Sequence, residues 1–226
     1  RRRKARMTSN ALPAPGSSER TRVRRFPEKS VDEREVLHAV LDAGLVAQVA
    51  VVDDDGQPYV VPVAYARDGE RVLFHGSTGS RLFRSLAAGA RTCLTVTLLD
   101  GLVLARSSFE SSMNYRSAMV LGSCEVLDGE EKERALRVIS DHLLPDRWDD
   151  IRPPSRKELA ATLVLALPLD EASGKISAGP PEDAEEDLDR PVWAGVVPIV
   201  ESFGVPEPDE AGAAFPTPAY LETWSR

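Results

Sequence analysis

The spacing of apolar residues predicts that the folded part of the chain opens with an amphipathic helix. Apolar residues recur at helical spacing between positions 36 and 41. Ser30–Glu33 has the form of a capping box before this segment, and Gly44 follows it as a stop signal. We therefore expect one helix that begins after Ser30, ends near Gly44 and packs its apolar face on a core.

Strand-like patterns follow the helix. Two apolar runs occupy residues 45–52 and 59–65, and an Asp-Gly pair turns the chain after each run. Two successive hairpins predict an antiparallel sheet. Pro62 lies inside the second run and cannot donate a ladder hydrogen bond, so we expect that strand to be irregular or to lie at an edge.

The middle of the chain adds more strands than helices. Helical spacing recurs at residues 130–144 and 156–161, whereas further apolar runs of strand type lie at residues 92–96, 98–105, 115–127 and 162–169. The first two runs can form one strand that bends at Asp100-Gly101. The pattern predicts a mainly β fold with peripheral helices, in a closed or partly closed barrel. From Asp170 onward it predicts loops.

Composition limits the class of protein. The chain has 226 residues, of which 42% are hydrophobic, and this suits one domain with one core. No run of eighteen apolar residues is present, so we expect no membrane span, no secretory signal and a cytoplasmic location. Cys93 and Cys124 lie in apolar runs and are expected to be reduced and buried.

Charge is distributed unevenly along the chain. Residues 1–25 contain nine Lys/Arg and one acid, and the remainder contains 19 Lys/Arg and 35 acids. The acidic remainder argues against a nucleic-acid-binding fold. The basic segment contains Pro, Gly and Ser, and we expect it to be a disordered tail.

Candidate chemistry gathers at residues 73–86, LFHGSTGSRLFRSL, where a strand passes into an amphipathic helix. The first backbone amides of a helix and its positive dipole end favour a phosphate group, and Arg81 adds a guanidinium. The turn matches neither of the two common phosphate loops. In the alternative interpretation, Ser80 is only a helix N-cap.

Five segments occur in an order that resembles a known superfamily: QPYVVPVAY, LFHGSTGSR, NYRSAMVLG, GKISAGPP and VWAGVVP. The chain resembles the pyridoxamine 5′-phosphate oxidase-like superfamily of flavin-binding split barrels, and within it the nitroimidazole-reductase-like branch. The resemblance implies a six-stranded antiparallel split β-barrel over residues 26–200, flanked by the tail at 1–25 and an extended arm at 201–226. It also implies a homodimer with FMN in a groove at the interface.

The resemblance also assigns residues. It implies that Ser77, Ser80 and Arg81 hold the FMN phosphate, next to Gly76, and that Pro62 and Val63 meet the edge of the isoalloxazine ring. The other residues that it implies at the cofactor are Tyr115, Arg116 and Ser117 on the neighbouring strand, and Lys175 and Trp193 toward the flavin of the other subunit. Simpler roles remain open: Trp193 can plug the barrel, Lys175 can be a solvated lysine and Tyr115 can bury its ring in the sheet.

His75 is the candidate catalytic residue. A histidine at this position in the nitroimidazole-reductase-like branch lies near the flavin, where it can contact a substrate or donate a proton. The alternative is a structural histidine at a strand end. His38 and His142 lie in helical patterns, and no carboxylate or cysteine stands at ligand spacing, so we expect no metal site.

The sequence leads to two main functional hypotheses. The first is an FMN-dependent oxidoreductase that acts on a small organic substrate, with NAD(P)H as a candidate reductant. Pyridoxamine phosphate is not the expected substrate: the resemblance implies that a true pyridoxamine phosphate oxidase carries a basic C-terminal segment that grips the substrate phosphate, whereas segment 192–204 here lacks arginine and histidine. The second is a non-catalytic split-barrel dimer that carries or senses flavin, haem or deazaflavin. A third alternative is that the barrel binds nothing and Arg81 pairs with an acid on a neighbouring subunit.

Overall fold

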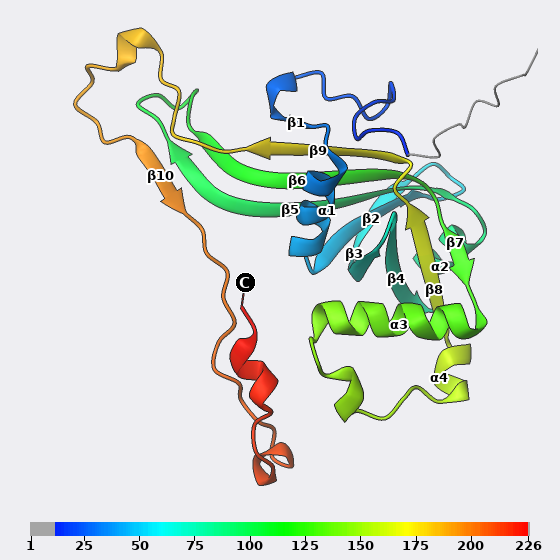
Figure 1. Cartoon of the computed structure of the whole chain (residues 1–226). Coiled ribbons are helices and arrows are strands. Elements are labelled where there is room, and N and C mark those ends of the chain that lie inside the picture. The colour runs from blue at the N-terminus through cyan, green and yellow to red at the C-terminus, as the bar shows by residue number, and fades with distance from the viewer. Residues whose placement is uncertain (1–11, 226) are drawn as a thin grey trace, which may run out of the picture.

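The computed structural model of the chain describes residues 12–225, and its strands form one antiparallel sheet that curls into a split barrel (Figure 1). The helices are α1 (Arg34–Ala43), α2 (Arg81–Ala87), α3 (Gly129–Leu143) and α4 (Arg156–Ala160). The strands are β1 (Ser30–Val31), β2 (Val46–Val52), β3 (Pro58–Asp68), β4 (Arg71–Ser77), β5 (Arg91–Leu104), β6 (Ser112–Ser123), β7 (Glu125–Leu127), β8 (Thr162–Pro168), β9 (Glu171–Ser177) and β10 (Gly195–Pro198).

The order of neighbouring strands is β1-β9-β6-β5-β2-β3-β4-β8-β7, and β10 pairs with β5. The predicted mainly β, antiparallel split-barrel class is confirmed, although ten strands are present where six were expected. Strand β9 was predicted to be a loop. It has the sequence EASGKIS, in which small and polar residues hide the strand pattern, but it pairs with β6 over seven residues.

The split lies between β3 and β4. Their pairing covers only Tyr65–Asp68 of β3 and Arg71–Phe74 of β4. Strand β3 continues along β2 from Val52 to Val46, whereas β4 pairs with β8 over its whole length. The two strands therefore separate, and the last three residues of β4, His75–Ser77, have no β3 partner.

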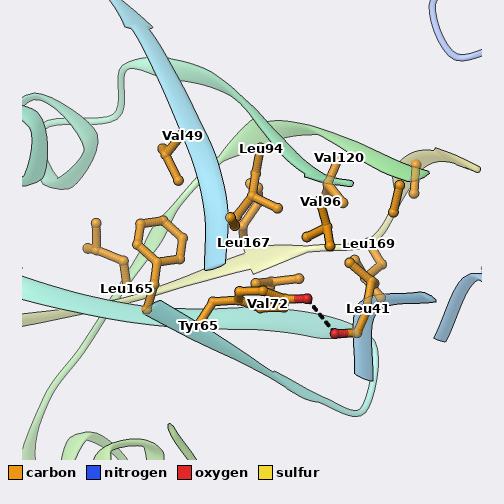
Figure 2. Packing of buried hydrophobic residues seen from close by; sticks show 14 of the residues in the cluster. Leu41, Val49, Tyr65, Val72, Leu94, Val96, Val120, Leu165, Leu167 and Leu169 are labelled. Carbon is orange, nitrogen blue, oxygen red and sulfur yellow. Dashed lines mark hydrogen bonds between the residues drawn. The ribbon is translucent and has the colours of Figure 1, made fainter. Parts of the chain in front are cut away.

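The main core fills the barrel. Buried side chains from β2, β4, β5, β6 and β8 meet the apolar faces of α1 and α2, and Figure 2 shows part of this packing. The Tyr65 hydroxyl donates a hydrogen bond of 2.5 Å to the Leu41 carbonyl at the end of α1. Helix α3 covers the outer face of β3, β4 and β8 through a second cluster around Leu73 and Ile139.

Two local predictions need correction. Ser30 does not cap α1: it pairs with Lys175 as part of β1, and the N-cap is Glu33, whose side chain makes no capping bond. The run at 115–127 is broken at Cys124 into β6 and β7, which pair with different strands. The bent strand around Asp100-Gly101 is confirmed, because the register of β5 on β6 shifts between Leu99 and Gly101.

The segments flanking the barrel make specific contacts. The Gly16 amide donates to the Ala172 carbonyl of β9, and Arg20 pairs with Glu171. Residues 1–11 of the predicted tail lie outside the described residues, and the disordered tail at 1–25 stays a prediction. The limits at residues 26 and 200 stay predictions.

After β10 the chain runs away from the sheet and returns toward the loop that follows α3 (Figure 1). There the Tyr220 hydroxyl donates to Asp150 at 2.7 Å, and the Trp224 indole donates to the Pro145 carbonyl at 3.3 Å. Within residues 12–225, no helix has both the length and the hydropathy that a bilayer crossing requires.

Candidate functional site

The turn between β4 and α2 is where the sequence predicted a phosphate site. Strand β4 ends at Ser77, and α2 begins after Ser80, whose side chain makes no capping bond. The amides of Thr78, Gly79 and Ser80 donate to the Ala161 carbonyl, the Ser77 hydroxyl and the Ser77 carbonyl at 3.0–3.1 Å. These three amides are therefore not free for a ligand. An anion at this turn would have to be held by the side chains and by the first amides of α2.

Gly76 is required for packing. A Cβ atom at this position would lie 2.3 Å from a ring carbon of Phe83. The Phe83 ring in turn meets Phe74 edge-on, with 5.8 Å between ring centroids. Gly76 thus allows α2 to lie close against β4, which fixes the position of Ser77, Ser80 and Arg81. Its contacts give it this packing role, and its place beside the cofactor phosphate stays a prediction.

Arg81 is the exposed cation of the turn, with 71% of its side chain accessible. Its guanidinium lies over the Tyr59 ring at 4.4 Å from the centroid, and Nη1 is 3.9 Å from a carboxylate oxygen of Asp53. The hydroxyl of Tyr59 is buried and has no hydrogen-bond partner among the described residues. Arg81 therefore has an acidic neighbour in its own chain, yet its exposure leaves it able to contact an anion.

His75 differs from the other two histidines. Neither nitrogen of its ring contacts a hydrogen-bond partner within residues 12–225, whereas His38 bonds to Glu70 at 3.2 Å and His142 to the Gly44 carbonyl at 2.7 Å. The His75 side chain reaches solvent, but the surrounding chain still desolvates it and lowers its pKa. A neutral imidazole with free nitrogens can accept a proton or ligate a metal.

Strand alternation divides the predicted cofactor residues between two faces of the sheet. The registers of β2–β6, β8 and β9 put one set on the outer face, away from the barrel core: Pro62, His75, Ser77, Tyr115, Ser117 and Lys175. The side chains of Val63 and Arg116 point to the inner side of the sheet, because they alternate with the residues just named along their strands. A Cβ atom at Gly76 would also point inward. Val63 packs on the main core, so only its backbone can meet a ligand on the outer face.

Beyond the part that α3 covers, the outer face is open and partly apolar. Along it, Ser117 lies between Thr97 of β5 and Lys175 of β9, and Gln48 lies between Pro62 and Thr95. Neighbouring strands are about 4.8 Å apart, so the five strands from β3 to β9 span about 19 Å. Valines 46 and 60 are 48% and 59% exposed there. A flat ligand or another protein surface can lie on this face.

Lys175 lies in a cationic cluster at the edge of the sheet. Its ammonium donates to the Arg25 carbonyl at 3.2 Å and lies 5.4 Å from the centroid of the Phe26 ring. Arg25 and Lys29 approach the same ring at 5.0 and 4.9 Å. Lys175 is thus held by the segment before β1, which removes the alternative of a freely solvated loop lysine.

Trp193 and Tyr115 both lie outside the barrel core. Trp193 is 65% exposed and lies against Gly195 at the start of β10, where a Cβ atom would be 2.9 Å from the indole. It therefore does not plug the barrel. Tyr115 is half-buried on the outer face opposite Leu99 and Ser177.

Arg116 belongs to a different part of the molecule, a pocket of about 620 Å³ that the sequence did not predict. We call it the C-terminal pocket. The Arg116 guanidinium bonds to Asp100 at 2.6 Å, and this hydrogen bond raises the pKa of the arginine. The pocket lies between the end of α1, the bend of β5, the end of α3 and residues 199–203 and 223–225. Residues 199–203 and 223–225 close the pocket, and they show no hydrophobic periodicity. No local sequence pattern therefore predicts the pocket.

The fold and the turn after β4 define a split barrel of the flavin-binding type. The family model for pyridoxamine 5′-phosphate oxidase matches residues 33–176, and the chain belongs to this family. The resemblance found in the sequence is therefore confirmed.

Solved structures agree with this assignment. The FAD and haem binding protein from Mycobacterium smegmatis is 43% identical, with a TM-score of 0.83, and the match covers 87% of this chain and 97% of that one. The flavocytochrome Anf3 from Azotobacter vinelandii is 41% identical, with a TM-score of 0.86 and coverage of 94% and 98%.

A putative 5-nitroimidazole antibiotic resistance protein from Bacteroides thetaiotaomicron shares the fold at 24% identity, with a TM-score of 0.56 and coverage of 65% and 86%. No curated protein is similar enough to match the chain.

Proposed function

We propose that this protein is a flavin-dependent redox protein that also binds haem and works as a homodimer. The observation that carries the proposal is the β4–α2 turn, where the exposed Arg81 guanidinium and the His75 imidazole, which has no hydrogen-bond partner among the described residues, are six residues apart. Support comes from the two proteins with 41% and 43% identity, which are described as a flavocytochrome and as an FAD and haem binding protein.

The residues present fit a flavin phosphate. Arg81 is exposed, Ser77 and Ser80 carry hydroxyls in the same turn, and the hydroxyl of Tyr59, whose ring lies under Arg81, has no partner among the described residues. A guanidinium can bind two oxygens of a phosphate at once. A flavin of either form, FMN or FAD, carries such a group. Bound flavin would supply hydride and electron transfer, and the chain would supply anchoring and orientation.

His75 fits the role of haem ligand better than His38 or His142. Both of the other rings already bond to protein oxygens, and the desolvation that lowers the pKa of His75 keeps its imidazole neutral at pH 7. Neutral imidazole is the form that ligates iron. If haem is absent, the same ring is available to contact an organic substrate that is reduced at the flavin.

The homodimer is proposed from the outer face. Exposed valines and small residues form a continuous surface over β2, β3 and β5 next to the β4–α2 turn. A second copy seated there would cover this apolar area and enclose a flat cofactor between two sheets.

The first test compares arginines on one helix. We expect Arg81→Ala to weaken FMN and FAD binding by about 10- to 100-fold, the loss that corresponds to a hydrogen bond to a charged group. Arg84→Ala is the control, because Arg84 is exposed on the same helix one turn later. Binding is followed by flavin absorbance on reconstitution. Equal affinities for the two variants would contradict the phosphate site.

For haem, His75→Ala should abolish the Soret shift produced on adding hemin, while His38→Ala should retain it. If the Soret shift persists in His75→Ala, another residue is the axial ligand of the haem. That result would contradict the role of His75 and would not bear on the proposed flavin site.

A further inference from the structure

About half of the wall of the C-terminal pocket is apolar. Its volume of about 620 Å³ is within the usual range for small-molecule sites, which runs from about 300 to 1,000 Å³. The apolar side chains around it come from five separate segments and include Leu45, Leu98, Leu99, Leu143, Phe203 and Trp224. Phe203 and Trp224 contact each other, with 5.6 Å between ring centroids.

The charged groups that line the pocket are engaged within the protein. Asp42 accepts two hydrogen bonds from Arg67 at 2.7 and 2.8 Å, and Asp100 accepts from Arg116 at 2.6 Å. His142 bonds to the Gly44 carbonyl, and Glu201 also has an interaction partner. The pocket therefore has no unpaired charge among these groups to attract an ion. Burying a charged ligand here would cost solvation without a compensating partner.

A clasp of three hydrogen bonds holds the outer wall. The Tyr220 hydroxyl accepts from Arg147 at 3.0 Å and donates to Asp150 at 2.7 Å, and the Trp224 indole donates to the Pro145 carbonyl at 3.3 Å. Tyr220 and Trp224 also stack, with centroids 6.3 Å apart. The clasp fixes the Trp224 ring at the pocket although only a short 3₁₀ turn forms this segment.

We propose that the C-terminal pocket binds an uncharged, planar aromatic molecule of two or three rings. Aromatic and aliphatic walls gain from burying such a surface, and paired charges do not oppose a neutral guest. The Arg116 guanidinium gives one polar contact at the wall, suited to a carbonyl or nitro oxygen. This site is separate from the proposed flavin turn, so it extends the proposed function without depending on it.

The test uses a neutral fluorescent ketone, 6-propionyl-2-dimethylaminonaphthalene, whose emission shifts to the blue in apolar surroundings. Ala43→Phe adds a ring at the exposed end of α1, where Ala43 lines the pocket. The matched control is Ala39→Phe, one turn earlier on α1 and also exposed, but outside the lining. We expect Ala43→Phe to raise the Kd of the probe at least tenfold and Ala39→Phe to change it less than twofold.

Two further measurements complete the test. Trp224→Ala removes the aromatic wall and should weaken the probe as well, and the thermal midpoints of all variants identify any that fail to fold. The anionic probe 8-anilinonaphthalene-1-sulfonate should bind at least tenfold more weakly than the ketone. No blue shift with the wild-type chain, or the same Kd in both phenylalanine variants, would overturn the proposal. Probe binding that appears only after a dimer is diluted into monomers would also overturn the proposal, because a second copy of the chain would then fill the pocket in the dimer.

Discussion

At the scale of single residues, Gly76 and Phe83 determine how the turn after β4 is built. The sequence predicted the turn and its N-cap position correctly, because a strand pattern and a helix pattern meet there. It could not predict that Gly76 is needed for the Phe83 ring, since that contact joins residues on different elements. Nor could it predict that Thr78, Gly79 and Ser80 donate their amides inside the protein.

Gly76→Ala is expected to lower the free energy of unfolding by about 1–3 kcal/mol, the usual cost of overpacking a core. The added methyl would lie 2.3 Å from a Phe83 carbon, and Phe83 is buried. Gly79→Ala, three residues along the same turn, meets nothing closer than 3.5 Å and is the control. Urea unfolding of both variants measures the difference. Equal midpoints would show that α2 can shift without cost.

At the scale of elements, apolar periodicity identified most helices and long strands, and it failed where pairing with a neighbouring strand determines the structure. β9 contains Gly174 and two serines, so its pattern is weak, yet its place between β6 and β1 makes it a strand. Ser30 has the sequence signature of a cap, but pairing with Lys175 takes its backbone into β1. A capping box does form at α4, where Ser155 accepts from the Glu158 amide and Glu158 accepts from the Ser155 amide.

Two serine N-caps provide a paired test. Ser155→Ala should destabilise α4 by about 1 kcal/mol, the typical value for a lost cap, and speed hydrogen exchange at the Leu159 amide. Ser80→Ala should leave stability nearly unchanged, because the Ser80 side chain makes no capping bond in α2. Exchange measured by NMR distinguishes the two. A large loss of stability in Ser80→Ala would mean that Ser80 does cap its helix in solution.

At the scale of the whole molecule, the family resemblance gave the split barrel, and the alternation of side chains then sorted the candidate residues. Six of the predicted cofactor residues lie on the outer face, while Arg116 points to the C-terminal pocket. That pocket needed the complete fold, because its walls come from α1, β5, α3 and the last residues of the chain.

The proposed dimer predicts that a charge on the outer face separates the two copies. Val46→Glu should shift the sedimentation coefficient from that of a dimer to that of a monomer, because a carboxylate would be buried without a partner. Val126→Glu on β7 is a close control, since both valines are 48% exposed. A wild-type chain that sediments as a monomer, or two variants that behave alike, would contradict an interface at this face.

The segment before β1 has a consequence for handling the protein. β9 pairs along one edge with β6, and along the other edge its backbone partners within residues 12–225 are the two residues of β1 and the Gly16 amide. A chain shortened past residue 31 would present a bare row of peptide groups to its neighbours in solution. Such rows recruit further strands, so trimming this stretch to tidy an expression clone would invite precipitation and leave a less soluble product.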